Sequence, residues 1–281
     1  MKKEPKPLVK MLAYAFLVLA VLFSIYPVWF AFLASVRPGQ RLYTLNLTGM
    51  FLPTEFTLEN FRVLLFEKDF LLWARNSLFV ASLTTIACVT LATSGAFAFS
   101  RFRFKGREAG LILFLAVQAF PGVLSLVPIA LLLYRLGLFG SHWGLILAYS
   151  TGSLVFTTWN LKGYFDTIPI DLEEAAMIDG CGPVQSFIRI ALPLARPALA
   201  VTALFGFMGG WNEYVMASVL LVGQADKYTL PIALAQLAND IQVPWGLYAA
   251  GALLVSIPVL VLFLWLQKYL ESGLTLGGVK G

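Results

Sequence analysis

Ionisable residues that could do chemistry are rare in the long apolar stretches of this chain, and Glu213 is the clearest of them. It lies in the run Trp211-Asn212-Glu213-Tyr214, inside an apolar segment. A charge at the centre of a bilayer costs about 2.5–3.5 kcal/mol on insertion scales, so Glu213 should face protein, water or a solute. Two interpretations stay open: Glu213 bonds a neighbouring helix, or it lies with Trp211 and Asn212 near a translocation path.

The loop 166–197 carries the second concentration of polar residues, and we expect it to form two short helices. Asp171 can cap the first helix, with Glu174 three residues later at capping-box spacing. Asp179-Gly180 ends this helix. Gly182-Pro183 then begins the second helix, because proline is favoured at the first helical position.

The second short helix has an apolar stripe that must be buried somewhere. Its members recur at i, i+3, i+4 and i+7, the spacing of one helix face. They are Val184, Phe187, Ile188 and Ala191. The stripe could pack on the inner ends of the chain's own helices, or it could fill a groove on a partner protein. The residues alone favour neither alternative.

Several kinds of catalytic and cofactor site are excluded by the sequence. The chain has no Gly-Lys dipeptide and hence no P-loop, and it has neither H-E-x-x-H nor G-x-S-x-G. His142 is the only histidine, which excludes a multi-histidine metal site, and Cys88 and Cys181 are too differently placed to pair. We therefore expect no catalytic residue, no metal and no cofactor here. Energy for uphill work would come from an ion gradient or from a partner.

The composition is that of a membrane protein. Of the 281 residues, 59% are hydrophobic and 12% are charged, whereas about 25% are charged in soluble domains. A helix needs about 20 apolar residues to span the bilayer, and six segments qualify. They are Met11–Val36, Asn76–Phe99, Gly110–Tyr134, Trp143–Tyr164, Ala198–Val222 and Leu247–Gln267. The fourth is the most polar and is expected to pack against protein.

The elements that must position these residues are thus six transmembrane helices in an all-α membrane protein. The basic cluster 101–107 lies between the second and third spans, and positive charge favours the cytoplasmic side. Both termini and the short helices between spans four and five are therefore predicted to be cytoplasmic. The net charge of +5 fits this bias better than nucleic-acid binding. The chain divides into 1–70 (tail, first helix and outer loop), a core 71–267 and a tail 268–281.

Fixed spacing in the cytoplasmic loop indicates a family. Glu174-Ala175-Ala176, Gly180 and Ile190-Ala191-Leu192-Pro193 fit E-A-A-x3-G-x9-I-x-L-P. This pattern resembles the coupling motif of type I ABC importer permeases. Nearly the whole chain is similar to the binding-protein-dependent carbohydrate branch, most of all to maltose/maltodextrin permeases of the MalG type. Trp211-Asn212-Glu213-Tyr214 and the glycine-rich end 273–281 carry that closer resemblance.

The resemblance implies a transport subunit in the cell inner membrane, not an enzyme, that works with other chains. These would be a homologous second permease (MalF-like), a dimer of ATPase subunits (MalK-like) that holds ATP and Mg, and an extracytoplasmic substrate-binding protein. ATP-driven closure of the ATPases would open the cavity outward to receive carbohydrate, which the resemblance to the MalG type implies to be maltose or maltodextrin.

The resemblance also implies residue roles. The loop contact with the ATPase would involve Glu174, Ala175, Ala176, Asp179, Gly180, Ile190, Leu192 and Pro193. The tail would reach between the two ATPase subunits through Thr275, Gly277, Gly278 and Lys280. Trp211, Asn212 and Glu213 are candidates for the translocation path. Other oligosaccharides or polyols remain possible substrates, and an ion-coupled transporter or a purely structural membrane subunit remain alternatives.

Overall fold

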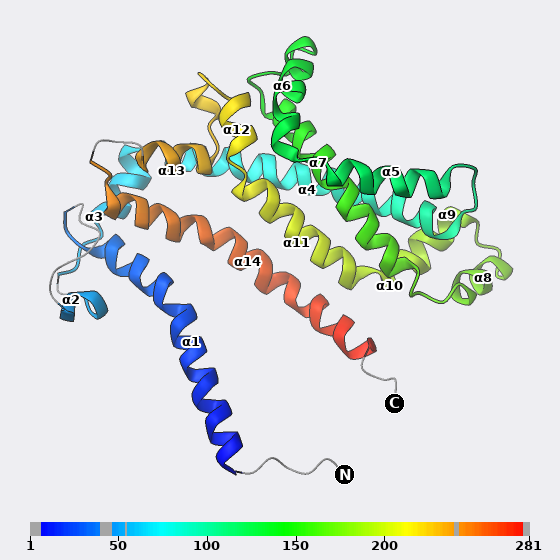
Figure 1. Ribbon diagram of the computed structural model, residues 1–281, viewed down its shortest axis with the longest axis horizontal. Helices are drawn as coiled ribbons and strands as arrows, with labels where there is room; N and C mark the ends of the chain where they lie inside the picture. The colour runs from blue at the N-terminus through cyan, green and yellow to red at the C-terminus, as the bar shows by residue number, and fades with distance from the viewer. Residues whose placement is uncertain (1–6, 40–46, 54, 239–241, 278–281) are drawn as a thin grey trace. The chain divides into compact units, whose positions relative to one another are not determined.

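The computed structural model describes residues 7–39, 47–53, 55–238 and 242–277, and these contain helices and loops without a strand. Figure 1 shows the helices in chain order. Their bounds are α1 Pro7–Val36, α2 Leu47–Phe51, α3 Glu59–Arg62, η1 Val63–Glu67, α4 Phe70–Arg101, α5 Arg107–Ala119, η2 Gly122–Ser125, α6 Leu126–Arg135, α7 His142–Phe165, α8 Asp171–Ile178, α9 Pro183–Ser186, η3 Phe187–Ala191, α10 Leu192–Leu194, α11 Arg196–Asn212, α12 Val215–Leu220, η4 Ala225–Lys227, α13 Leu230–Ala238 and α14 Trp245–Gly277.

Within the described residues, three helices are long and apolar enough to cross a membrane: α1, α4 and the part of α14 from Trp245 to Tyr269. Two bent helix pairs raise this number to five if each is one span. They are Arg107–Ala119 with Gly122–Arg135, and Pro183–Leu194 with Arg196–Asn212. All six predicted spans fall on helices, and the all-helical membrane fold is confirmed. The number six and the cytoplasmic termini stay predictions.

The chain folds as two compact units. The first comprises 1–71 and 234–257. In it the amide of Asn60, which is buried, donates to the carbonyls of Ser35 (2.8 Å) and Arg37 (3.2 Å). Leu33, Val36 and Leu64 are also buried in this unit. These contacts tie the end of α1 to the segment that follows it.

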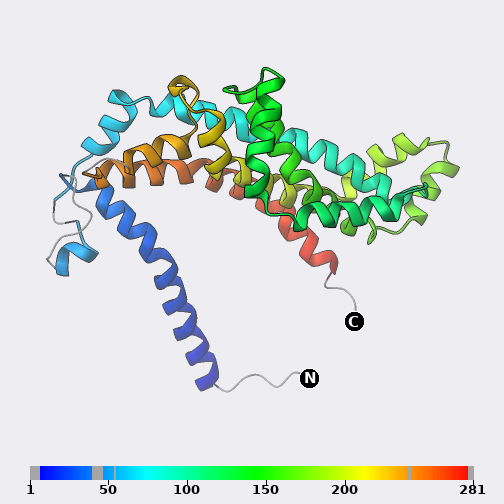
Figure 2. The same cartoon turned by 45° about the horizontal axis from the view of Figure 1, so that its top comes forward.

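The second unit, 72–233 with 258–281, is organised around α7. This helix contacts α5, α11 and α12, as the two views in Figures 1 and 2 show. Its polar residues Ser150, Thr157 and Thr158 are buried, and the Thr158 hydroxyl donates to the Leu154 carbonyl at 2.7 Å. The expectation that this polar span packs against protein is therefore confirmed.

Two of the predicted spans are broken. In the third, α5 ends at Ala119 and the two halves are bent by 92°. Pro121 explains this break: it disfavours helical conformation in the residue before it, and Phe120 is extended (φ −77°, ψ 130°). In the fifth span, α11 ends at Asn212 and α12 begins at Val215. The predicted spans over 110–134 and 198–222 are thus each divided into separate helical segments.

The hairpin loop and the cavity at the broken helices

The loop between α7 and α11 forms the expected helical hairpin. Its turn depends on Gly180, whose φ of 91° lies in the left-handed region that glycine adopts at little cost. The amide of Gly180 donates to Met177 O and that of Cys181 to Ala176 O, both at 3.0 Å. These bonds end α8 and turn the chain toward α9.

The predicted capping role of Asp171 is wrong. The helix α8 begins at Asp171 itself, and the N-cap position is occupied by Ile170, which has no capping side-chain bond. The helix starts one residue early because the Ile170 carbonyl already accepts from the amides of Glu173 (2.9 Å) and Glu174 (3.0 Å). Asp171, Glu173 and Glu174 all lie in the first turn, where negative charge is favourable.

In the apolar stripe of the second short helix, two residues pack on the chain's own helices and two are exposed. Ala191 is buried, and Phe187 packs with it in a cluster formed by the ends of α4 and α7. The rings of Phe187 and Phe97 have centroids 4.5 Å apart. In contrast, Val184 and Ile188 are 69% and 54% exposed. Half of the stripe therefore anchors the hairpin on the chain's own helices, and half faces outward.

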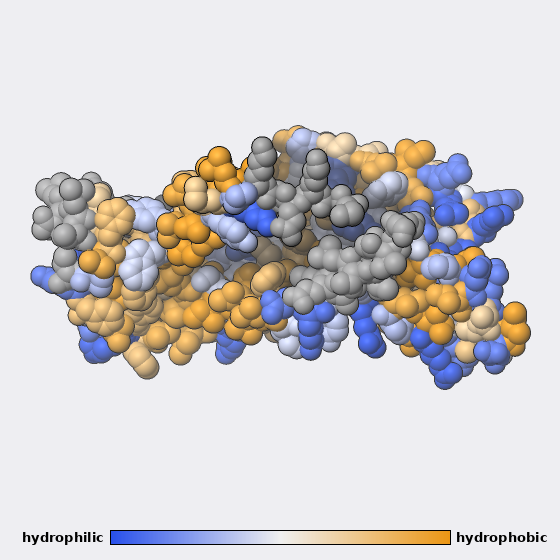
Figure 3. Space-filling view, turned by 90° about the horizontal axis from the view of Figure 1, so that it is seen from below, coloured by the Kyte–Doolittle hydropathy of each residue, from blue (hydrophilic) through white to orange (hydrophobic). Residues whose placement is uncertain are grey.

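The motif residues lie largely on the outside of the hairpin. Glu174, Ala175, Asp179 and Gly180 are exposed, while Ala176, Ile190, Leu192 and Pro193 are partly buried. Ile178, beside the turn, is 87% exposed. Together with Val184 and Ile188 it forms what we term the outer patch. Figure 3 shows hydrophilic and hydrophobic residues side by side at the end of the second unit where α8 lies.

A buried ion pair that sequence reasoning missed fixes the orientation of α8. Arg101 Nε lies 2.7 Å from Glu173 Oε1, and the two side chains are only 9% and 3% exposed. Arg101 Nη2 also donates to the Ile168 carbonyl at 2.9 Å. In the sequence, Arg101 is recognisable only as part of the basic cluster 101–107, which predicts the orientation of the chain in the membrane. No sequence signal pairs it with Glu173, because the two are far apart in the chain.

A second ionic contact adjoins this pair. Asp166, at the end of α7, accepts from Lys162 Nζ and Ser100 Oγ, each at 2.6 Å. Burial opposes ionisation of the Asp166 carboxyl, but these hydrogen bonds and the charges of Lys162 and Arg101 hold its pKa below the ordinary value. The ends of α4 and α7 are thus joined directly beneath the hairpin.

Glu213 lies at the break between α11 and α12 and not in the middle of a continuous helix. One carboxylate oxygen accepts from the amide of Met216 at 2.7 Å, and the other from the amide of Ala217 at 3.0 Å. The Tyr149 hydroxyl also donates to it. The carboxylate therefore satisfies the free amides at the start of α12, where negative charge is stabilised.

Trp211 and Asn212 face different surroundings from Glu213. Trp211 is buried and stacks on Phe207, with ring centroids 5.4 Å apart and planes at 18°. Asn212 is exposed. The tryptophan ring is therefore used in packing, as tryptophan in a helix usually is.

The two helix breaks meet at one open cavity of about 300 Å³. Glu213, Tyr149 and Ser153 supply polar groups to its wall, beside Gly122 and Ser125 from the other break. Irregular backbone at membrane depth is tolerated where it is buried in protein or lines water. A cavity is therefore expected where two spans break together.

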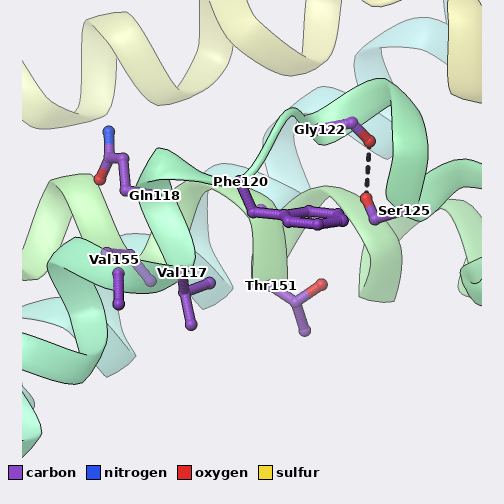
Figure 4. Close-up of a pocket in the computed structure, with 9 residues that line it drawn as sticks. Val117, Gln118, Phe120, Gly122, Ser125, Thr151 and Val155 are labelled. Carbon is purple, nitrogen blue, oxygen red and sulfur yellow. Dashed lines mark hydrogen bonds between the residues drawn. The ribbon is translucent and has the colours of Figure 1, made fainter.

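A larger hollow of about 670 Å³ adjoins this cavity and shares Gly122, Ser125 and Gly152 with it. In Figure 4 the ring of Phe120 extends toward Ser125, whose hydroxyl donates to Gly122 O at 2.6 Å, with Thr151 on the α7 side. The wall thus combines an exposed aromatic ring with hydroxyl groups.

The predicted tail contacts are described only in part. Thr275 and Gly277 belong to the helical backbone of α14, which continues to Gly277. Gly278 and Lys280 lie outside the described residues.

Known proteins resemble this chain over nearly its whole length. A family profile described as "Binding-protein-dependent transport system inner membrane component" matches residues 89–276. The galactooligosaccharides transport system permease protein GanQ of Bacillus subtilis is 39% identical over 96% of this chain and 95% of its own. The maltose/maltodextrin transport system permease protein MalG of Salmonella typhimurium is 38% identical over 91% and 90%.

The fold has also been seen in a solved structure, that of a bacterial ABC transporter involved in the import of the acidic polysaccharide alginate. It matches with a TM-score of 0.81 and 24% identity, over 93% of this chain and 96% of that one. The resemblance inferred from the loop motif is thereby confirmed. The chain belongs to the binding-protein-dependent transport system inner membrane components, the permease subunits of ABC importers.

Proposed function

We propose that this chain is one of two permease subunits of an importer for neutral oligosaccharides, with six spans and both termini in the cytoplasm. The relatives named above transport maltose/maltodextrin and galactooligosaccharides. Maltodextrin is the leading substrate, because the Trp211–Tyr214 run and the C-terminal residues resemble the MalG type. A galactooligosaccharide is the second candidate, supported by the 39% identity to GanQ.

The hairpin α8–α9 is the proposed docking element for an ATPase subunit. The observation that carries this role is its division into an anchored side and the outer patch. Ile178, Val184 and Ile188 stay exposed although the adjacent Phe187 is packed on the chain's own helices. Exposed apolar side chains on a rigid helical hairpin fit a groove on another protein.

The proposed transport cycle is the one that the resemblance to type I ABC importer permeases implies. A docked ATPase dimer that closes on ATP pulls the hairpins of the two permeases together, and the movement turns the cavity outward. A substrate-binding protein then delivers sugar from outside, and hydrolysis returns the cavity to its inward-facing state. In this scheme ATP and Mg stay on the ATPase, and the 275–281 tail contacts its subunits.

The cavity at the two helix breaks is the part of this subunit proposed to line the sugar path. Its polar groups are carried by α7 and by the broken segments, which is where substrate sites of other transporters form. Glu213 contributes by holding the break open with its bonds to Met216 and Ala217. Trp211 has a packing role in this proposal.

Reconstitution of the complete transporter in proteoliposomes tests the proposal. The variants are Ala176→Asp and Gly180→Asp on the hairpin, and the control is Ala225→Asp, which introduces the same charge at an exposed position outside the hairpin. We expect both hairpin variants to abolish ATP-driven uptake of radiolabelled maltodextrin while remaining in the membrane, and the control to transport normally. Uptake at the wild-type rate by the hairpin variants would contradict ATPase docking there.

The same vesicles discriminate the remaining alternatives. Competition by unlabelled maltodextrin and by galactooligosaccharide shows which sugar is preferred. Uptake that needs no ATP and collapses with an uncoupler would instead identify an ion-coupled transporter.

A further inference from the structure

A buried ion pair outside the motif residues joins α8 to the end of α4. We term it the Arg101–Glu173 bridge. The pair is buried, at 9% and 3% side-chain exposure, and its N–O distance is 2.7 Å. Glu173 belongs to the first turn of α8, whereas Arg101 is the last residue of a helix long and apolar enough to span the membrane. The bridge therefore links the hairpin directly to a membrane helix.

Arg101 holds the hairpin at more than one point. Its Nε bonds Glu173, its Nη2 bonds the Ile168 carbonyl at 2.9 Å, and its Nη1 bonds Ser100 Oγ at 3.1 Å. A guanidinium presents its donors in a rigid planar fork, so three such bonds fix direction as well as distance. The turn before α8 and the first turn of α8 are both held to the same side chain.

The bridge continues into α7. Ser100 Oγ donates to Asp166 Oδ1 at 2.6 Å, and Lys162 Nζ lies 2.6 Å from Asp166 Oδ2. A continuous polar chain thus runs from Lys162 on α7 through the end of α4 to Glu173 on α8. Covalent connection joins the hairpin to α7 and α11, and this network and the adjoining apolar cluster join it to α4.

A buried ion pair is a poor way to gain stability, because desolvation offsets most of the attraction. An apolar pair of similar size would often stabilise the fold as well or better. What the charged pair provides is a fixed orientation of α8 relative to α4. That property matters if α8 must move a membrane helix and not merely rest upon it.

We propose that Arg101 and Glu173 are positioning residues that transmit the movement of the docked hairpin to α4. This inference rests on the proposed function, since it assumes that an ATPase moves the hairpin. Neither residue needs to touch ATP, sugar or the ATPase. Loss of the bridge leaves docking and hydrolysis in place and separates hydrolysis from transport.

The test measures sugar molecules imported per ATP hydrolysed in reconstituted complexes. The main variant is the double change Arg101→Met with Glu173→Met, which removes both charges and leaves no unpaired buried ion. We expect the ATPase to co-purify in normal amounts and to hydrolyse ATP, while sugar imported per ATP falls about tenfold, within the range typical of coupling between sites. The control is Arg62→Met with Glu59→Met, because that pair is 62% and 55% exposed.

Two further variants keep the test decisive if the double variant does not fold. The exchange Arg101→Glu with Glu173→Arg should recover part of the ratio that the single Glu173→Arg variant loses. Arg101→Lys keeps the charge but not the fork, so it should lower the ratio without changing ATPase binding. An unchanged ratio in a folded double variant, or in Arg101→Lys, overturns the inference. Wild-type vesicles without ATP-driven uptake would instead overturn the proposed function.

Discussion

At the scale of single residues, the surroundings of a charged group combine partners that are near and far in the sequence. Asp166 at the end of α7 has one partner four residues away, Lys162, and one on another helix, Ser100. Its carboxylate is held by Lys162 and Ser100, and its pKa is lowered by these contacts against the opposing effect of burial. A carboxyl group whose pKa is lower in the folded state stabilises that state when ionised.

The pH dependence of folding should therefore include a contribution from Asp166. The contribution is fully present above the ordinary pKa of 3.8 and is lost as the pH falls through the lowered value in the folded protein. We expect Asp166→Asn to flatten the acid limb of a plot of thermal midpoint against pH for the detergent-solubilised protein. The control is Asp69→Asn, at an exposed carboxylate. An acid limb identical to that of the wild type would rule out this role.

Glu213 shows which part of a residue's role can be predicted from sequence. Its apolar context indicated correctly that it must be satisfied by protein or solute. The actual solution is a helix start: the amides of Met216 and Ala217 need acceptors, and the carboxylate supplies both. Nothing in the run Trp211–Tyr214 marks a break, because the neighbouring Tyr149 hydroxyl that completes the site comes from α7.

At the scale of elements, the hairpin turn contains two glycines, Gly180 and Gly182, that differ in backbone conformation. Gly180 has a φ of 91°, whereas Gly182 has a φ of −74°. No atom lies within 4 Å of a Cβ added at either position. A steric clash is thus expected at neither position, and the two glycines differ in the sign of φ.

We expect Gly180→Ala to destabilise the turn by about 1–2 kcal/mol, the cost of left-handed backbone for an L-residue. Gly182→Ala should have little effect. Hydrogen exchange at the Cys181 amide, which bonds Ala176 O, reports on this turn. Exchange should quicken by about fivefold to thirtyfold in Gly180→Ala. Equal rates in the two variants would show that the left-handed conformation is not retained in solution.

The apolar segments of the sequence predict where the helices lie. Of the two helix breaks, only the one at Pro121 has a local signal in the sequence. Pro121 carries a local signal for the break in the third span, because proline constrains the residue before it, but it does not specify the bend of 92°. The break at Glu213 has no such signal. Long-range contacts decide it, as they decide the Arg101–Glu173 bridge and the division of the apolar stripe into Phe187 inside and Ile188 outside.

At the scale of the whole molecule, the proposed topology places the hairpin and the cavity on defined sides of the membrane. Thiol labelling of Cys181 can test this topology, because Cys181 is next to the hairpin turn and partly exposed, while Cys88 is buried. Removing Cys88 leaves one thiol for labelling.

In a Cys88→Ala background, a membrane-impermeant maleimide should label Cys181 in inside-out vesicles and not in right-side-out vesicles. Bound ATPase should protect it. As the matched control, Ala225→Cys in a background without Cys181 should label from the opposite side. Labelling of Cys181 from outside would contradict the proposed orientation, and labelling unaffected by ATPase would contradict docking at the hairpin.

The two faces of the hairpin also have a consequence for chimeric permeases, in which a segment of one permease replaces that of another. Phe187 and Ala191 are constrained by this chain's own helices, whereas Ile178, Val184 and Ile188 are constrained only by what binds them. Transplanting a whole hairpin would replace Phe187 and Ala191 with residues that are not fitted to the close-packed cluster at the ends of α4 and α7. If the outer patch is the ATPase-docking surface proposed above, transplanting it alone should change which ATPase the permease binds and leave the permease's own interior unchanged.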